Sequence, residues 1–240
     1  MLRKILQSFW ILVWSLLSFK EVLAQPEESF RAERRHMVVW QLKARDITDT
    51  RVLAAMEKVP RHKFVPAFLA PLAYLDQPLP IGSGQTISQP YIVALMTQWA
   101  EIRPGDKVLE VGTGSGYQAA ILAELTDLVF TVELLPELAH SAQERLEKLG
   151  YENIRLRCGD GYLGWPEEAP FDAILVTASA PEIPKALKEQ LREGGRLIIP
   201  LGHPDGVQQL LRLRLSGGEL REEERLPVRF VPLVRGKEQK

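Results

Sequence analysis

The stretch VLEVGTGSGYQAA, residues 108–120, decides the fold of this chain. It begins as an apolar strand, passes glycines at positions 112, 114 and 116, and continues with a helical pattern. Glycine lets the backbone turn sharply and approach a ligand closely, and a helix N-terminus offers unpaired N–H groups to a negative group. The stretch therefore predicts a strand, a tight turn and a helix arranged around a nucleotide-like ligand.

Apolar runs continue on both sides of this turn and alternate with helical patterns. The predicted strands are KVLEV, LVFTVE, NIRLRC, FDAILVT and GRLIIPLG, and the predicted helices between them span 118–125, 137–149 and 184–191. This alternation is typical of right-handed βαβ units. We therefore expect an α/β fold, a Rossmann-like doubly wound and mostly parallel sheet with helices on both faces.

Further elements flank this core. Helical spacing of apolar residues covers 28–42, 49–59 and 91–100, whereas prolines and glycines predict a loop-rich bridge between Pro60 and Pro90. Near the other end, Ser216-Gly217-Gly218 separates two alternating runs and predicts an antiparallel hairpin. The chain from 25 to 240 is thus expected to be one domain, with a helical and loop part at 28–100, a ligand-binding core at 104–202 and a hairpin at 207–235.

The first 24 residues look like a separate leader. Arg3 and Lys4 precede an apolar run from Ile5 to Phe19, and an A-x-A-like pattern ends at Ala24. This run is shorter than the roughly 20 residues of a membrane-spanning helix. The pattern predicts a secretory signal, with an uncleaved anchor as the alternative.

Composition limits the possible partners and chemistry. The chain has 30 basic and 31 acidic side chains, so nothing predicts a nucleic-acid surface. Its single cysteine, Cys158, excludes an intramolecular disulfide, and its four histidines lack metal-ligand spacing. We expect no metal site.

Acidic residues follow three of the predicted strands. Glu110 lies where it would repel a pyrophosphate but accept hydrogen bonds from an ammonium group, and Glu133 ends the next strand, where it can accept both ribose hydroxyls. Asp160 lies between two glycines and could accept an adenine amine hydrogen. The string from Gly114 to Ala119 also satisfies G-x-G-x-x-A, so a dinucleotide site stays open, although Glu110 speaks against it.

GQTISQP, residues 84–90, sets two hydroxyl residues, Thr86 and Ser88, between glycine and proline. These breakers predict an irregular segment through which neither helix nor strand runs. One interpretation is a rigid frame that presents the hydroxyls to a ligand. The other is that Ser88 caps the helix beginning near Pro90.

Together these motifs resemble a known family. The Glu-Val-Gly-Thr-Gly-Ser-Gly turn resembles motif I of class I S-adenosylmethionine methyltransferases. VLAAMEKVPRHKFVP, GQTISQPYIVALMT, GDGYLGWPEEAPFDAILVTA, IPKALKEQLREGGRLIIPLG and RFVPLV resemble the protein-L-isoaspartate O-methyltransferases. The resemblance covers about Arg31 to Val234, and the leader departs from the family pattern.

The resemblance implies methyl transfer from S-adenosyl-L-methionine to the free carboxylate of L-isoaspartyl residues, which starts repair of damaged proteins through a succinimide. It implies that Ser88, oriented with Thr86, positions that carboxylate, and that residues 228–233 contact the peptide. A carboxylate is ionised at neutral pH, so the reaction needs no general base. The predicted cofactor-binding residues are Glu110, Gly112, Thr113, Gly114, Gly116, Glu133, Asp160, Gly161 and Thr177.

The expected partners are isoaspartyl proteins and peptides, with no stable membrane insertion unless the leader is retained, and we expect a monomer. Two other functions stay open: a nicotinamide-dependent oxidoreductase, and an exported binding module without activity. The leader favours a periplasmic location, whereas cofactor supply and the habit of the family favour the cytoplasm.

Overall fold

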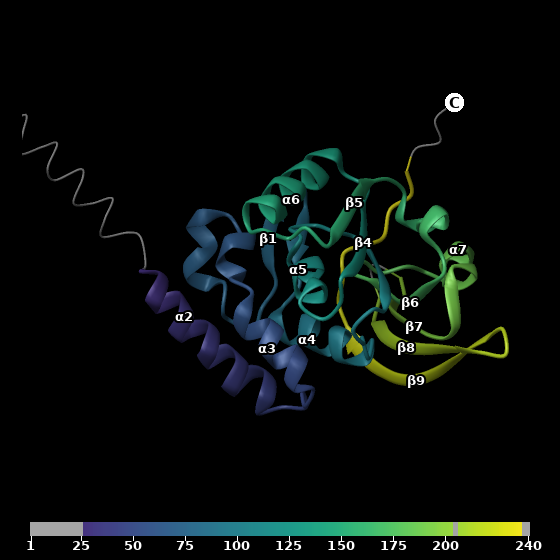
Figure 1. Ribbon diagram of the computed structural model, residues 1–240, viewed down its shortest axis with the longest axis horizontal. Coiled ribbons are helices and arrows are strands. Elements are labelled where there is room, and N and C mark those ends of the chain that lie inside the picture. Colours follow the sequence, from purple (N-terminus) through teal and green to yellow (C-terminus); the bar gives the residue numbers. More distant parts are fainter. Residues whose placement is uncertain (1–25, 204–205, 237–240) are drawn as a thin grey trace, which may run out of the picture.

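The computed structural model describes residues 26–203 and 206–236 (Figure 1). The leader predicted at residues 1–24 lies outside the described residues. Within the described ranges, no helix has the length and apolar character that a bilayer crossing requires.

A seven-stranded sheet forms the centre of the molecule (Figure 1). Its order is β5-β4-β3-β6-β7-β8-β9; the first five strands are parallel, and β8 and β9 form an antiparallel hairpin at one edge. This confirms the predicted mostly parallel sheet with its C-terminal hairpin. The strands are β3 Lys107–Val111, β4 Leu128–Glu133, β5 Ile154–Cys158, β6 Phe171–Val176, β7 Leu191–Leu201, β8 Gln208–Ser216 and β9 Glu219–Val228.

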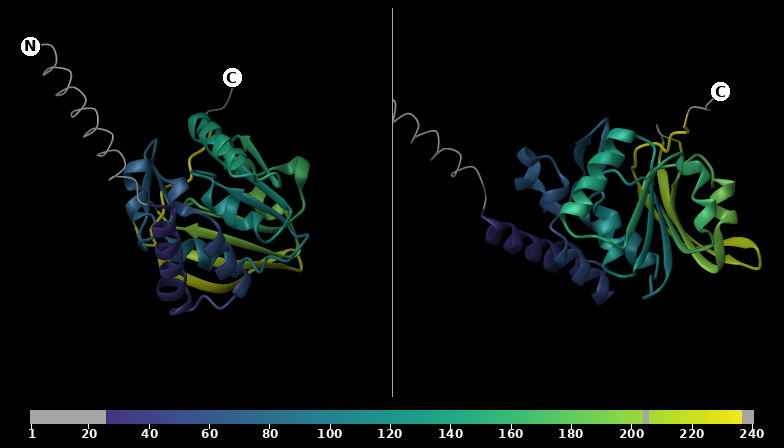
Figure 2. Two further views of the ribbon diagram at one scale, coloured as in Figure 1. Left: turned by 60° about the vertical axis from the view of Figure 1, so that its left-hand side comes forward. Right: turned by 45° about the horizontal axis from the view of Figure 1, so that its top comes forward.

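Helices cover both faces of the sheet, as Figure 2 shows. The core on one face includes residues of α2 Glu27–His36, α3 Thr50–Lys58, α4 Pro90–Trp99, α5 Tyr117–Ala123 and α6 Pro136–Lys148, and the core on the other includes α7 Lys185–Glu189. The helices α4, α5 and α6 contact the sheet, whereas α2 and α3 pack mainly on other helices. Because alternate strand residues point to opposite faces, Val108 belongs to the first core and Leu109 to the second. Both side chains are fully buried.

Three local expectations were wrong in detail. The predicted first helix is two elements, because α2 gives way to a π-helix, η1 Met37–Lys43. The bridge before Pro90 contains 3-10 helices, η2 Arg61–Phe64 and η3 Ala67–Leu72. The helix predicted to reach Leu191 ends at Glu189, since Leu191 already belongs to β7.

The segment Gly84–Pro90 also contains a strand, contrary to expectation. β1 Leu79–Gly82 pairs with β2 Gln85–Ile87 in a separate two-stranded hairpin. The two residues between them, Ser83 and Gly84, have φ angles of 49° and 69°. Two successive positive φ angles are the geometry of a tight hairpin turn, so the glycine here reverses the chain between two strands.

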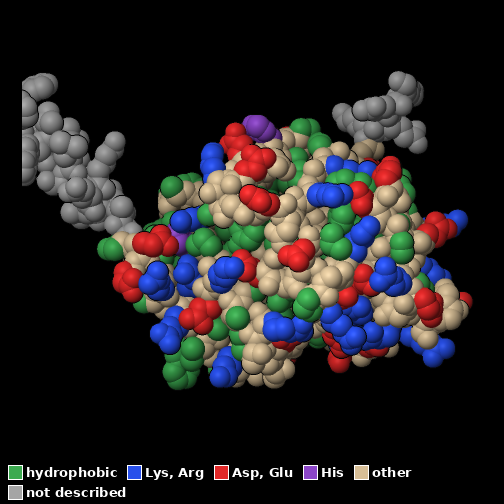
Figure 3. All heavy atoms as spheres, in the orientation of Figure 1, with side chains coloured by type: hydrophobic (Ala, Val, Ile, Leu, Met, Phe, Trp, Pro, Cys, Tyr) green, Lys and Arg blue, Asp and Glu red, His purple; other side chains and the backbone are tan. Residues whose placement is uncertain are grey.

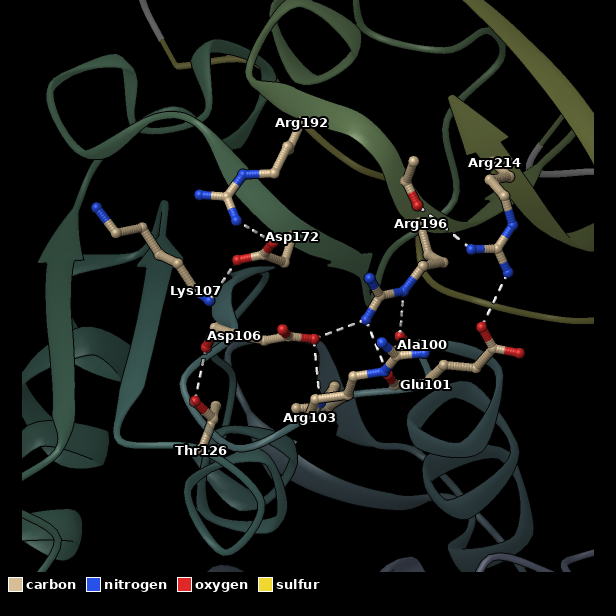
Figure 4. Close-up of polar contacts among 12 residues, drawn as sticks. Ala100, Glu101, Arg103, Asp106, Lys107, Thr126, Asp172, Arg192, Arg196 and Arg214 are labelled. Atoms are coloured by element: carbon tan, nitrogen blue, oxygen red, sulfur yellow. Dashed lines mark hydrogen bonds and ion pairs between the residues drawn. The ribbon is translucent and has the colours of Figure 1, made fainter. Parts of the chain in front are cut away.

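Figure 4 shows how α4 and the sheet are joined near the start of β3. The Arg196 side chain on β7 donates to the carbonyls of Ala100 at 2.6 Å and Glu101 at 2.9 Å, and to the Asp106 carboxylate at 2.8 Å. The Asp106 carboxylate also accepts from the backbone N–H of Arg103 at 3.0 Å. This network ties the loop that leads into β3 to β7, which lies on the far side of β6 in the sheet.

Charged side chains of both signs are interspersed over the face shown in Figure 3. On the C-terminal hairpin, Arg212 and Arg214 each form ion pairs with Glu101 and Glu223. These contacts join β8 to β9 and to the end of α4. Charged residues along the outer strand also disfavour pairing with another sheet.

We predict that Arg196→Met lowers the free energy of unfolding by about 2–4 kcal/mol, because it removes the charged partner of the mostly buried Asp106 carboxylate and the side-chain donor of two carbonyls. Arg192→Met is the control: its side chain is 54% exposed and pairs with Asp172, so its loss should stay below about 1 kcal/mol. Urea denaturation measures both, and equal losses would contradict the assigned role of Arg196.

Candidate functional site

The candidate site lies at the carboxyl ends of β3 and β6. From β3 the chain continues outward to β4 and β5, then returns to β6 on the other side of β3. Ligands of open α/β sheets bind at such a reversal of strand order. The Thr177 hydroxyl, directly after β6, lies within hydrogen-bond distance of the Gly112 carbonyl at 2.6 Å and the Val111 carbonyl at 3.0 Å. This contact fixes where the glycine turn leaves the sheet.

Two adjoining hollows open at this point. The first, about 150 Å³, is lined by the glycine turn, the end of β4 and residues 231–234. The second, about 240 Å³, is lined by Ser88, the start of α4 and residues 226–231. Thr86 and Thr177 line both hollows. The structure therefore brings the GQTISQP segment and the glycine turn to one site, although more than twenty residues separate them.

Glu110 is fully buried beneath the glycine turn. Its carboxylate accepts a hydrogen bond from the Thr131 hydroxyl at 2.5 Å, and the hydroxyls of Thr131 and Thr113 are 2.6 Å apart. Burial raises the pKa of Glu110 to about 8. Its second oxygen, Oε1, has no hydrogen-bond partner among the described residues, and Glu110 and Thr113 both line a small space shared with Ser88.

Thr131 was missed by the sequence analysis. The available signal was a hydroxyl residue at an inward position of the apolar run LVFTVE, where a buried polar side chain needs a partner. Since the Thr131 proton bonds to Glu110, the Thr113 hydroxyl is the donor to Thr131. Thr113 and Glu110 are thus joined through one buried chain of hydrogen bonds.

Glu133 lies on the wall of the first hollow. Its carboxylate accepts hydrogen bonds from the backbone N–H of Gly114 at 2.8 Å and of Leu135 at 3.0 Å. It therefore joins the glycine turn to the end of β4. Contact of Glu133 with a ribose stays a prediction.

Gly116, the last glycine of the turn, has a φ angle of 85°, and a side chain there would also press against Leu146.

Asp160 does not line either hollow among the described residues, whereas Gly161 lines the first. The Asp160 carboxylate accepts from the backbone N–H groups of Tyr162 at 2.8 Å and Gly236 at 3.0 Å. A Cβ atom on Gly161 would lie 2.5 Å from the Val111 side chain. Asp160 thus holds the loop and the C-terminal segment in place, and its contact with adenine stays a prediction.

Thr86 is exposed and Ser88 is half-buried. Within the described parts of the chain, neither hydroxyl has a hydrogen-bond partner. The capping interpretation of Ser88 is wrong, because Gln89 is the residue before α4 and the Asp76 carboxylate accepts from the Tyr91 backbone N–H at 2.9 Å. Sequence analysis could not find this cap, because Asp76 lies in an irregular segment well before the helix.

The chain after β9 returns beside the site (Figure 1). The backbone N–H of Ser179 donates to the Val231 carbonyl at 2.8 Å, and that of Leu233 donates to the Ser179 carbonyl at 2.7 Å. Residues 231–234 therefore line the first hollow and residues 226–231 line the second. Contact of residues 228–233 with the peptide stays a prediction. The sequence analysis did not anticipate that Ser179 holds this segment through its backbone.

The fold and site define a Rossmann-like protein of the methyltransferase type, with a glycine-rich turn at the strand-order reversal and a second hollow beside it. The model of one family, "Protein-L-isoaspartate(D-aspartate) O-methyltransferase (PCMT)", matches residues 33–238. The chain belongs to this family.

Relatives agree with this assignment. A protein-L-isoaspartate O-methyltransferase of Opitutus terrae is 58% identical over 205 residues, covering 85% of this chain and 88% of the relative. One of Gloeobacter violaceus is 56% identical over 203 residues, covering 85% and 99%. The nicotinamide alternative finds no support among these relatives.

Solved structures also agree. A protein-L-isoaspartate O-methyltransferase superposes with a TM-score of 0.74 at 33% identity, covering 82% of this chain and 65% of that one. A putative one from Plasmodium falciparum, in complex with S-adenosyl-L-homocysteine, gives a TM-score of 0.73 at 30% identity, covering 84% and 98%.

We predict that Gly112→Ala destabilises the protein by about 1–3 kcal/mol, because Gly112 has a φ angle of 98° and its new Cβ would lie 2.5 Å from the Thr177 hydroxyl oxygen. In a Thr177→Ala background the same change should cost less, because the clashing oxygen is gone. Thermal unfolding of the four proteins measures the difference, and an unchanged cost would show that the clash is absent.

Proposed function

We propose that this protein transfers a methyl group from S-adenosyl-L-methionine to the free carboxylate of L-isoaspartyl residues in damaged proteins and peptides. The observation that carries the proposal is the pair of unbonded hydroxyls, Thr86 and Ser88, beside the glycine turn of a chain in this family. Ser88 would donate a hydrogen bond to the substrate carboxylate, with Thr86 helping to orient it.

The residues around the first hollow fit the cofactor. Glu110 offers a buried carboxylate oxygen without a partner, which suits the ammonium of an amino-acid-bearing ligand. Gly112 and Gly114 leave the turn free of side chains where the ligand would approach. Glu133 offers a carboxylate for the ribose hydroxyls at the end of β4, where nucleotide-binding sites of Rossmann folds place an acidic residue. When bound, the cofactor supplies an electrophilic methyl carbon.

The protein's own contribution is alignment. The substrate carboxylate is already ionised at neutral pH, so no residue has to remove a proton from it. Holding reactants in line can lower a barrier by about 7–11 kcal/mol. The arrangement of hydroxyls on a fixed segment beside a fixed turn supplies this alignment.

The purified protein should transfer labelled methyl from S-adenosyl-L-methionine to an isoaspartyl peptide and leave the matching aspartyl peptide unlabelled. The discrimination is expected because the two linkages place the free carboxylate at different distances from the peptide backbone. Scintillation counting of the separated peptides measures both. Equal labelling would refute the proposed substrate.

Replacing Ser88 with alanine should lower kcat about 10- to 150-fold, which corresponds to one lost hydrogen bond to a charged group. Ser83→Ala is the matched control, since Ser83 lies in the hairpin just before Ser88 but its hydroxyl donates to Glu137 on the surface. Steady-state kinetics with the isoaspartyl peptide measure both variants. Wild-type turnover in Ser88→Ala would remove Ser88 from the mechanism.

Affinity for S-adenosyl-L-homocysteine should rise with pH between about 6 and 8 and then level off. The pKa of Glu110 is raised to about 8 in the free protein, so Glu110 is mostly protonated at neutral pH. A nearby ligand ammonium favours the ionised form, so binding releases a proton below that pKa. Glu110→Gln should bind more weakly and show no such slope. Calorimetry in buffers of different ionisation enthalpy measures the proton release, and its absence would contradict the role of Glu110.

A further inference from the structure

Arg61, at the start of η2, is fully buried. Its Nε donates to the Ala73 carbonyl at 2.8 Å and its Nη2 donates to the Ser88 carbonyl at 2.7 Å. Its third nitrogen, Nη1, has no hydrogen-bond partner among the described residues. No carboxylate in the described part of the chain forms an ion pair with it.

A buried guanidinium without a carboxylate is costly, because burial removes the hydration of a full charge. Burial lowers the pKa of Arg61 to about 10, so the group still carries its charge at neutral pH. Two backbone carbonyls and the ring of Tyr117, whose centroid lies 4.8 Å from the guanidinium carbon, surround it. An apolar side chain of similar length would avoid the cost of a charge, but it would leave the Ala73 and Ser88 carbonyls without the Arg61 donor. Arg61 therefore does more than fill space, because it holds two backbone segments.

The contacts of Arg61 lie on both sides of the candidate site. Tyr117 is the first residue of α5, directly after the glycine turn. Ser88 follows β2 and faces the second hollow. Arg61 therefore connects the backbone of the segment proposed to align the substrate with the helix that follows the cofactor turn.

The Ser88 segment is fixed through its backbone while its hydroxyl stays free. Arg61 donates to the Ser88 carbonyl, and the Asp76 carboxylate accepts from the backbone N–H of Tyr91, three residues after Ser88. The Ser88 hydroxyl itself forms no hydrogen bond within the described ranges. Such an arrangement orients a donor and leaves it available for a ligand.

We propose that Arg61 is a positioning residue for methyl transfer: by holding the Ser88 carbonyl from inside the protein, it aims the Ser88 hydroxyl at the substrate carboxylate. This inference rests on the proposed function of the same site. It predicts that the contribution of the Ser88 hydroxyl depends on Arg61.

A double-mutant cycle tests this dependence. Kinetics with the isoaspartyl peptide compare wild type, Ser88→Ala, Arg61→Met and the double variant. Arg61→Met alone should lower kcat about tenfold or more, with a smaller change in KM and an unchanged affinity for S-adenosyl-L-homocysteine. In the Arg61→Met background, Ser88→Ala should cost no more than about threefold, because a hydroxyl that is no longer aimed contributes little.

Arg34→Met is the matched control. Arg34 is also buried and donates to the Glu57 carbonyl at 2.5 Å and the Tyr74 hydroxyl at 3.1 Å, without contact to residues 84–90. It should destabilise the fold, yet the full effect of Ser88→Ala should persist beside it. If Arg61→Met does not fold, Arg61→Lys replaces it in the cycle, since lysine keeps the charge but cannot donate to both carbonyls in the same plane.

The outcomes separate the two proposals. No methylation of the isoaspartyl peptide by the wild type would refute the proposed function. Methylation with fully multiplicative effects of Arg61→Met and Ser88→Ala would refute only the role of Arg61, and so would equal behaviour of the Arg61 and Arg34 variants. A Ser88→Ala variant with wild-type kcat would refute both the serine's role and this inference.

Discussion

The close packing of Gly112 against Thr177 is the constraint on which the rest of the site depends. At this point β3 and β6 end side by side, and the Thr177 hydroxyl lies against two backbone carbonyls where any larger residue than glycine would clash. The turn can therefore leave the sheet only along one path. That path opens one hollow toward β4 and a second toward the GQTISQP segment, with Thr177 on the wall of each.

Near this turn, two buried charged residues each keep one polar atom without a hydrogen-bond partner among the described residues. Glu110 lies beneath the turn with one oxygen unpaired, and Arg61 lies behind the Ser88 segment with one nitrogen unpaired. Each raises the free energy of the folded protein, because each removes a charge or a polar atom from water. Buried polar groups that raise the free energy of the folded state are expected at functional sites. Here they bracket the space in which an electron-poor methyl carbon and an anionic oxygen would meet.

The sheet could be predicted because its signals are local. Apolar runs such as KVLEV and the glycine turn that follows are patterns within a few residues, so they can be recognised without knowledge of distant contacts. The β1–β2 hairpin escaped prediction because Ser83 gave no sign of its positive φ angle. Contacts between distant segments could not be predicted either: the Asp76 cap of α4 and the bond from Arg61 to Ser88 each join residues that no periodicity relates. The residues of the site were thus recognisable, whereas their supports became visible only in three dimensions.

The central claim is that the protein aligns a ready-made nucleophile and takes no part in proton transfer. A crystal structure with S-adenosyl-L-homocysteine and an isoaspartyl peptide bound together tests it most directly. The account predicts the Ser88 hydroxyl about 2.5–3.0 Å from a carboxylate oxygen, with that oxygen facing the cofactor sulfur. A complex in which the carboxylate binds elsewhere, or faces an ionisable side chain placed to act as a base, would contradict the account.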